Sequence, residues 1–294
     1  MDGALPPPLM VSEPGSFAEY TITQRKPQVL ADILDTNSYP ADMAGALRSF
    51  TSELATGLVR PLQEETEDAA FWQQAWSRWE GKTWRQLSWF FAETYFYRRV
   101  LEIVRYFQPG HWYHQDPFAP QKRQALEEGL RQLASFYTSV PAGMTLQELF
   151  TLWLHRSLWG NRFDLSNVQA MVEAQQLHAR GTAEDLLLID HTQDLWSLLS
   201  GGGVSCLDVA ADNSGLELLS DLVLLDFLLT HGLVERARVH CKPQPFFVSD
   251  AMPQDMAMTC TALQGHPLAA LQELGVRLER YQQTGRLAVR THPF

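Results

Sequence analysis

Gly203-Val-Ser-Cys-Leu-Asp-Val-Ala-Ala-Asp-Asn-Ser-Gly-Leu-Glu217, followed by the apolar run Leu218 to Leu229, is the stretch that decides the fold of this chain. It is typical of a buried strand over Val204 to Val209, a sharp polar turn and then a long helix. In an open α/β sheet, ligands bind outside the carboxyl ends of the strands, where helix N-termini favour anions. The turn therefore places Asp212 and Asn213 where cation or phosphate chemistry takes place.

The composition is that of an ordinary globular protein. Of 294 residues, 45% are apolar and 19% are charged, enough to bury the core of one large domain or two smaller ones. A formal net charge of −11 disfavours nucleic acid or an anionic membrane surface as the partner. A small phosphorylated metabolite is compatible with this net charge as a ligand, since a bound metal ion reverses the local electrostatic field. We expect no obligate protein partner.

Cysteine usage and the apolar runs indicate the compartment. Cys206, Cys241 and Cys260 form no C-x-x-C pair and no disulfide framework, which fits a reducing environment. Residues 1–8 lack the basic and apolar segments of a secretory signal. The longest apolar run, Leu222 to Leu229, is too short for a membrane span. We therefore expect a soluble protein of the cytoplasm, with the nucleus as a second compartment.

The local composition and the hydrophobic pattern of the chain predict three regions. Residues 1–15 are rich in proline and glycine and predict a flexible arm, residues 16–180 predict a helical N-terminal region, and residues 181–294 predict an α/β domain. Within the helical region, Thr83 to Tyr106 predicts one long buried helix. Its arginines, Arg98, Arg99 and Arg105, are expected at the polar edge of that helix.

Short apolar runs alternate with helical patterns after residue 181. We expect strands at Val204 to Val209, Arg238 to Lys242 and Leu287 to Arg290, with helices from Leu216, at Gln254 to Leu263 and at Pro267 to Gln283. Further short strands are expected at Leu186 to Ile189 and Phe246 to Ser249. Strands separated by helices imply right-handed crossovers and a mainly parallel sheet, so the fold class is α/β.

Three oxygen-bearing residues are candidate metal ligands and catalytic groups. Asp212 and Asn213 follow one expected strand, and Asp250 follows the next apolar stretch, so both turns should lie at one edge of the sheet. Two carboxylates and an amide oxygen suit Mg²⁺ or Mn²⁺. Such an ion polarises a phosphoryl oxygen and lowers the pKa of a bound water. Lys242 is placed to pair with a phosphate.

Each of these residues also has a purely structural interpretation. Ser214 and Glu217 have the spacing of a capping box, in which Glu217 only satisfies a backbone N–H. Asp212 and Asn213 are common turn residues, and Asp250 is suited to cap the helix that follows it. The pattern alone leaves both interpretations open.

Five stretches of the chain resemble the metal-dependent damage-control phosphatase family, formerly domain of unknown function 89. The likeness is strongest to its eukaryotic subgroup, also described as acidic-residue (protein-glutamate) methyltransferases. The stretches are Ser16-Phe-Ala-Glu-Tyr-Thr21 with Arg25-Lys-Pro27, Trp89-Phe-Phe-Ala-Glu93 with Tyr95 to Arg99, Leu158-Trp-Gly-Asn-Arg-Phe-Asp-Leu-Ser166, Asp212-Asn-Ser-Gly-Leu-Glu-Leu218 with Asp221, and Lys242-Pro-Gln-Pro-Phe-Phe-Val-Ser-Asp250. The separation between Asp212 and Asp250 also resembles the spacing in the family.

The resemblance implies a helical region followed by a Rossmann-like α/β/α domain that holds one divalent ion through Asp212, Asn213 and Asp250. It implies hydrolysis of sugar phosphates such as fructose 1-phosphate, supported by Mn²⁺, Co²⁺ or Ni²⁺. Asn161, Glu217 and Lys242 are then expected to bind substrate. Under the alternative activity, protein-glutamate O-methylation, Glu217 and Asp250 match positions proposed to contact S-adenosylmethionine.

The chain departs from the family pattern in two places. Ser214 stands where the family usually has alanine. The family's later Lys-Gly-Asp-Leu-Asn-Tyr segment and Arg-Thr-x-Lys motif, which bind phosphate and sugar, have no match, since Arg290-Thr-His-Pro293 has proline in place of the lysine. We therefore expect a chain that lacks the family's C-terminal third. A non-enzymatic fragment that keeps the metal ligands is the third hypothesis.

Overall fold

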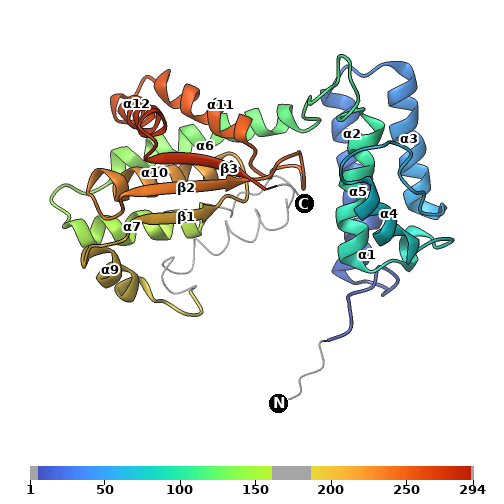
Figure 1. Cartoon of the computed structure of the whole chain (residues 1–294), viewed down its shortest axis with the longest axis horizontal. Coiled ribbons are helices and arrows are strands. Elements are labelled where there is room, and N and C mark those ends of the chain that lie inside the picture. Colours follow the sequence, from blue (N-terminus) through green and yellow to red (C-terminus); the bar gives the residue numbers. More distant parts are fainter. Residues whose placement is uncertain (1–5, 161–186, 293–294) are drawn as a thin grey trace. The chain divides into compact units, whose positions relative to one another are not determined.

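The computed structural model describes residues 6–160 and 187–292. The contacts divide the chain into two units, one up to Pro120 and one from Gln121 onward (Figure 1). None of the helices in the described ranges is both long enough and apolar enough to cross a lipid bilayer.

The first unit is built from helices. They are α1 (Phe17–Tyr20), a π-helical turn (Thr21–Arg25), α2 (Lys26–Thr36), α3 (Ala41–Thr56), α4 (Ala69–Ser77), a 3₁₀ turn (Trp84–Gln86) and α5 (Trp89–Ile103). The first three follow one another without a break. Ser16 is the N-cap of this continuous helical segment, because its hydroxyl accepts a hydrogen bond from the Glu19 amide at 3.0 Å.

Helix α5 is the centre of the first unit and is shorter than the sequence predicted. Its aromatic residues Tyr95, Phe96 and Tyr97 have no exposed surface. The helix begins at Trp89 rather than at Thr83, because Thr83 forms a capping box with Gln86 that starts the separate 3₁₀ turn.

Two arginines predicted at the polar edge of α5 are buried instead. Arg98 is fully buried and Arg99 is 7% exposed, whereas Arg105 is exposed. The Arg98 guanidinium donates to Asp68 Oδ2 at 2.5 Å and to Glu64 Oε1 at 2.6 Å. A charge is tolerated in the interior only when it is paired and hydrogen-bonded, and these two acidic residues supply that pairing.

The second unit contains a parallel sheet, as the sequence predicted. Its strands are β1 (Cys206–Ala210), β2 (Arg236–Cys241) and β3 (Leu287–Thr291), in the spatial order β1-β2-β3 (Figure 1). Val209 pairs with Val239, and Val239 pairs with Val289. The strands therefore end at one edge, and the predicted α/β class is confirmed.

Helices connect and cover these strands. They are α6 (Ala119–Ser139), α7 (Leu146–Leu158), α9 (Thr192–Ser200), α10 (Leu216–Thr230), α11 (Pro253–Gln264) and α12 (Ala269–Gln283). Helix α10 joins β1 to β2, and it is buried around its circumference except at Glu217, Asp221 and Thr230. A helix that is apolar on all sides needs partners away from the sheet as well as on it.

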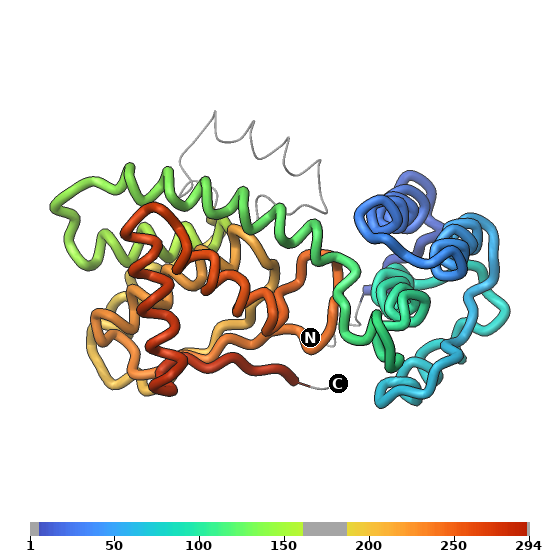
Figure 2. Tube along the Cα trace, turned by 90° about the horizontal axis from the view of Figure 1, so that it is seen from above, coloured from blue at the N-terminus to red at the C-terminus, as the bar shows by residue number. Residues whose placement is uncertain are grey.

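Helices α6 and α7 supply those partners. Leu126 and Leu133 of α6 and Phe150 and Trp153 of α7 belong to the same core as α10 and the sheet. Figure 2 shows α6, in green, running along the second unit. The contact-based division after Pro120 therefore differs from the sequence-based division at residue 180, because α6 and α7 cover α10.

Two expected strands are not formed. Residues 187–189 carry no strand, and Leu186 lies outside the described residues. Residues 247–249 form a turn, in which Phe247 and Val248 have φ angles of 48° and 70°. Apolar β-formers suggested a strand here, but left-handed backbone cannot continue a sheet ladder.

Glycines allow α10 to begin in close contact with its neighbours. A Cβ at Gly129 of α6 would lie 2.9 Å from the Leu216 amide nitrogen, and one at Gly160 would lie 2.7 Å from Glu217 Cα. Gly215, at the N-cap, has a φ of 82°, which a side chain disfavours. The start of α10 is thus held by backbone contacts that leave no room for a methyl group.

We expect Gly129→Ala to lower the free energy of unfolding by about 1–3 kcal/mol, because the new methyl group overpacks the contact with α10. Urea unfolding followed by circular dichroism measures this change. Gly45→Ala is the matched control, since a Cβ there meets nothing within 4 Å in helix α3. That variant should gain about 0.5–1 kcal/mol, and an equal gain at Gly129 would contradict the tight contact.

Candidate metal centre

The structure brings together the two turns that the sequence placed at one edge of the sheet. Asn213 and Asp250 are partners in an isolated antiparallel bridge. The Ser214 amide donates to the Ser249 carbonyl at 2.7 Å, and the Ala251 amide donates to the Asp212 carbonyl at 2.6 Å. We call residues 212–214 and 249–251, paired in this way, the turn junction.

The second segment of the junction reaches its place through a strained backbone. Phe247 and Val248 both adopt left-handed φ angles, which a β-branched residue such as valine rarely does. On the far side, the Lys242 amide donates to the Ala251 carbonyl at 2.9 Å. Asp250 thereby lies opposite Asn213 in the bridge and is 2% exposed.

The Asn213 side chain is held at both ends. Its Nδ2 donates to Glu217 Oε2 at 2.8 Å and lies 3.2 Å from Asp212 Oδ2, while its Oδ1 accepts from the Ser249 hydroxyl at 2.5 Å. Glu217 therefore binds the Asn213 amide, and Gly215, rather than Ser214, is the N-cap of α10. The capping-box interpretation of Ser214 and Glu217 does not describe this turn.

Four carboxylates interact electrostatically at this edge of the sheet. Burial raises the pKa of Glu217 to about 7, and the negative charges of Asp212 and Asp221 add to the rise. Burial also raises the pKa of Asp221 to about 6, although the Ser157 hydroxyl donates to its Oδ1 at 2.5 Å. Burial and the charge of Asp212 raise the pKa of Asp250 to about 6 as well.

Lys242 faces Asp250. Its Nζ lies 3.1 Å from Asp250 Oδ2, close enough for an ion pair but without the alignment of a hydrogen bond. This charge opposes the rise in the pKa of Asp250 without cancelling it. The lysine side chain is 40% exposed, so it stays within reach of a ligand at the rim.

The donor set at the junction suits a hard divalent cation by its chemistry. Asp212, Asn213 and Asp250 offer carboxylate and amide oxygens, the donors that Mg²⁺ and Mn²⁺ take in proteins. In residues 6–160 and 187–292, no group of three His, Cys, Asp or Glu side chains is arranged to hold a metal ion. The junction instead combines two carboxylates with the amide of Asn213.

One predicted site residue lies outside the described residues. Two further residues contact the site but were not predicted as site residues. Asn161 falls in the range that the structure does not describe. Asp221 belongs to a stretch that carries the family resemblance but was given no role in the site, and Lys122 was not singled out. Glu217 and Asp221 are four residues apart in a leucine-rich helix and so share a face. That spacing was the available signal for Asp221.

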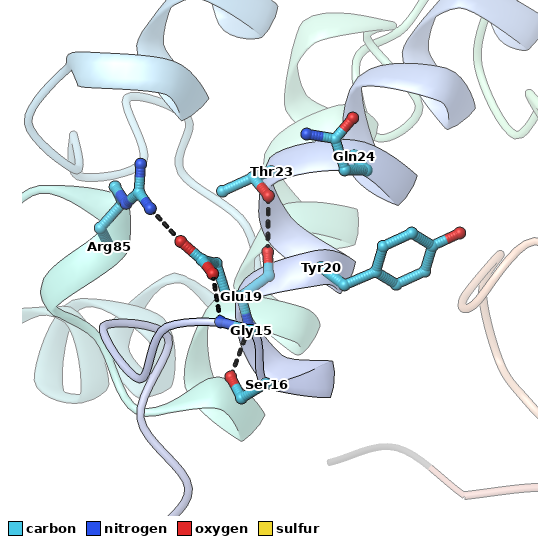
Figure 3. A pocket seen from close by; sticks show the side chains of 7 residues that line it. All are labelled: Gly15, Ser16, Glu19, Tyr20, Thr23, Gln24 and Arg85. Atoms are coloured by element: carbon cyan, nitrogen blue, oxygen red, sulfur yellow. Dashed lines mark hydrogen bonds and ion pairs between the residues drawn. The ribbon is translucent and has the colours of Figure 1, made fainter.

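A separate cavity of about 460 Å³ lies in the first unit (Figure 3). It is lined by Gly15, Ser16, Glu19, Tyr20, Thr23, Gln24 and Arg85. The Glu19 carboxylate accepts from the Gly15 amide at 2.8 Å and pairs with Arg85. The charged groups in this wall thus pair with one another.

The chain is similar to several curated proteins. It is 29% identical over 338 residues to the damage-control phosphatase ARMT1 of Danio rerio, covering 100% of this chain and 75% of that protein. The corresponding protein of Mus musculus is 29% identical over 328 residues, with 97% and 74% covered. The one from Homo sapiens is 28% identical over 335 residues, with 99% and 75% covered.

Among solved structures, a DUF89 family protein from Pyrococcus horikoshii is similar, with a TM-score of 0.49 and 15% sequence identity, covering 92% of this chain and 72% of that one. The family model described as the damage-control phosphatase ARMT1-like domain matches residues 21–294. This match spans most of the chain and confirms the resemblance carried by the five stretches. The chain therefore belongs to the damage-control phosphatase ARMT1-like family.

Proposed function

We propose that this protein is a metal-dependent phosphatase that hydrolyses sugar phosphates, with fructose 1-phosphate as a representative substrate. Membership of the damage-control phosphatase family supports hydrolysis of phosphorylated metabolites. Asp212, Asn213 and Asp250 are the proposed ligands of a divalent ion, with Mn²⁺, Co²⁺ and Ni²⁺ as candidates and Mg²⁺ as a further one.

The observation that carries the proposal is the excess of acidic side chains at the turn junction and on the adjoining first turns of α10. Asp212, Glu217, Asp221 and Asp250 influence one another electrostatically, and three of them have raised pKa values. Lys242 is the cation that pairs with Asp250. A phosphate dianion would be repelled by such a rim, whereas a divalent cation would neutralise it and attract the phosphate.

Asn213 and Lys242 have separate roles in this proposal. Asn213 presents an amide oxygen whose direction is set by Ser249 and by Glu217. Lys242 lies at the rim, 3.1 Å from Asp250 Oδ2, and its partly exposed ammonium group could also pair with a phosphate there. A bound divalent ion polarises a phosphoryl oxygen and lowers the pKa of a coordinated water.

The proposal predicts that Asp212→Ala removes activity. With Mn²⁺ present, kcat/KM for fructose 1-phosphate should fall by about 100-fold or more, because the ion loses a charged ligand. Asp208→Asn is the matched control, since Asp208 is an exposed carboxylate of β1 that binds Arg238 on the sheet. It should stay within about threefold of wild type, a change below 1 kcal/mol. Phosphate release measures both.

Turnover that persists in EDTA would contradict the proposed metal dependence. Equal losses in Asp208→Asn and Asp212→Ala would show a general effect on the sheet rather than loss of a ligand. Calorimetric titration with S-adenosylmethionine on the same preparation separates the methyltransferase alternative. Heat of binding without phosphate release would favour that activity.

The carboxylate excess also predicts how stability depends on pH. The pKa of Asp221 is raised from 3.8 to about 6 in the folded chain, so protonation favours folding below about pH 4 and this contribution is lost as pH rises through 6. In metal-free protein at pH 8, we expect Asp221→Asn to raise the free energy of unfolding by about 1–3 kcal/mol. At pH 4 the gain should vanish.

Urea unfolding at both pH values measures this difference. Glu127→Gln is the control, because Glu127 is an exposed carboxylate of α6 in the same unit. Its free energy of unfolding should change by less than about 0.5 kcal/mol at either pH. A gain in Asp221→Asn that is the same at pH 4 and pH 8 would mean that the effect is not electrostatic.

A further inference from the structure

A buried lysine of α6 contacts the turn junction. Lys122 is 1% exposed, and its ammonium group donates to the Asp250 carbonyl at 2.8 Å and to Asp255 Oδ2 at 2.8 Å. The same Asp255 oxygen accepts from the Met252 amide at 2.9 Å. Lys122 and Asp255 together therefore hold the backbone on both sides of Ala251.

This part of the backbone needs an external partner. Phe247 and Val248 lead into it with left-handed φ angles, so the local sequence does not favour its conformation. The carbonyl of the buried Asp250 would also carry a desolvation cost if it had no donor. An ammonium group has three donors and can satisfy a carbonyl and a carboxylate at once.

Lys122 donates to the backbone carbonyl of Asp250 and not to its carboxylate, which carries the proposed ligand atoms, although its charge also acts on that carboxylate and opposes the rise in the pKa of Asp250. Lys122 binds the backbone carbonyl of Asp250, while Lys242 faces the Asp250 carboxylate. In the same segment, the Ala251 amide reaches the Asp212 carbonyl, so a shift of Asp250 is passed on to the other turn. A change at Lys122 should therefore move the two turns relative to each other.

We propose that Lys122 is a positioning residue for the candidate metal centre, acting through the Asp250 backbone and Asp255. It touches neither ion nor substrate and sets the direction of the Asp250 carboxylate against Asp212. The inference rests on the proposed function, because it takes Asp250 as a metal ligand.

Lys122→Met tests this role, since methionine keeps the length of the side chain and removes its donors. We expect the dissociation constant for Mn²⁺, measured calorimetrically on metal-free full-length protein, to rise by about 10- to 100-fold. Lys26→Met is the matched control. Lys26 is also fully buried and binds Glu93 and Tyr97 in the first unit, so its loss should lower the melting temperature and leave Mn²⁺ affinity unchanged.

A second variant separates positioning from folding. In Lys122→Met/Asp255→Asn, the asparagine oxygen can still accept from the Met252 amide, and no unpaired charge is left in the core. Its melting temperature should recover relative to Lys122→Met, while Mn²⁺ binding stays weak. Hydrogen exchange of the Ala251 amide, which donates to Asp212, should accelerate in both variants.

The outcomes distinguish the two proposals. Failure of the wild-type protein to bind Mn²⁺ would overturn the proposed function and this inference with it. Tight Mn²⁺ binding by wild type and by Lys122→Met alike would overturn only the positioning role. So would an Ala251 amide that stays protected in the variants, or a loss of Mn²⁺ affinity in Lys26→Met equal to that in Lys122→Met.

Discussion

The backbone pairing between residues 212–214 and 249–251 is the constraint on which the second unit depends. The parallel register of β1 and β2 brings the ends of these strands to one edge, and the hydrogen bonds of the junction then join the segments that follow them. Asp212 and Asp250 meet only because of this pairing, since α10 and β2 separate them in the chain. The strained turn at Phe247 and Val248 is held in the same way, by contacts from elsewhere in the fold.

The same pairing concentrates charge. Burial disfavours ionised carboxylates, and neighbouring carboxylates disfavour one another, so both effects act in the same direction on Glu217, Asp221 and Asp250. In the first unit, by contrast, the buried Arg98 is matched by Asp68 and Glu64. Buried charge is also paired in the second unit, where Lys122 binds Asp255. The excess of carboxylates is therefore confined to the edge of the sheet, where α/β folds bind ligands.

Much of the second unit could be predicted because its signals are local. The apolar run and the polar turn around Asp212 marked the strand, the turn and the start of α10. The burial of Arg98 could not be predicted, because its partners lie about thirty residues away in the chain and the helical pattern does not include them. Lys122 was missed for the same reason, since its partners follow β2.

The turn over Phe247 and Val248 shows a different limit of prediction from sequence. Composition there favours a strand, and only the tertiary contacts impose the left-handed backbone. The division into two units could not be predicted from the sequence pattern either, because the sequence of a helix does not show which neighbouring element it packs against. The role of Asp212, Asn213 and Asp250 as metal ligands stays a prediction.

The close approach of Gly129 and Gly160 to the first residues of α10 has a thermodynamic consequence. Contacts between backbones, with no side chain between them, leave the start of the helix few alternative conformations. The loss of conformational entropy that orders this rim therefore occurs when the chain folds rather than when an ion or substrate arrives. A small ligand that bound at this rim, as proposed, would meet a preorganised surface and keep more of its interaction energy as affinity.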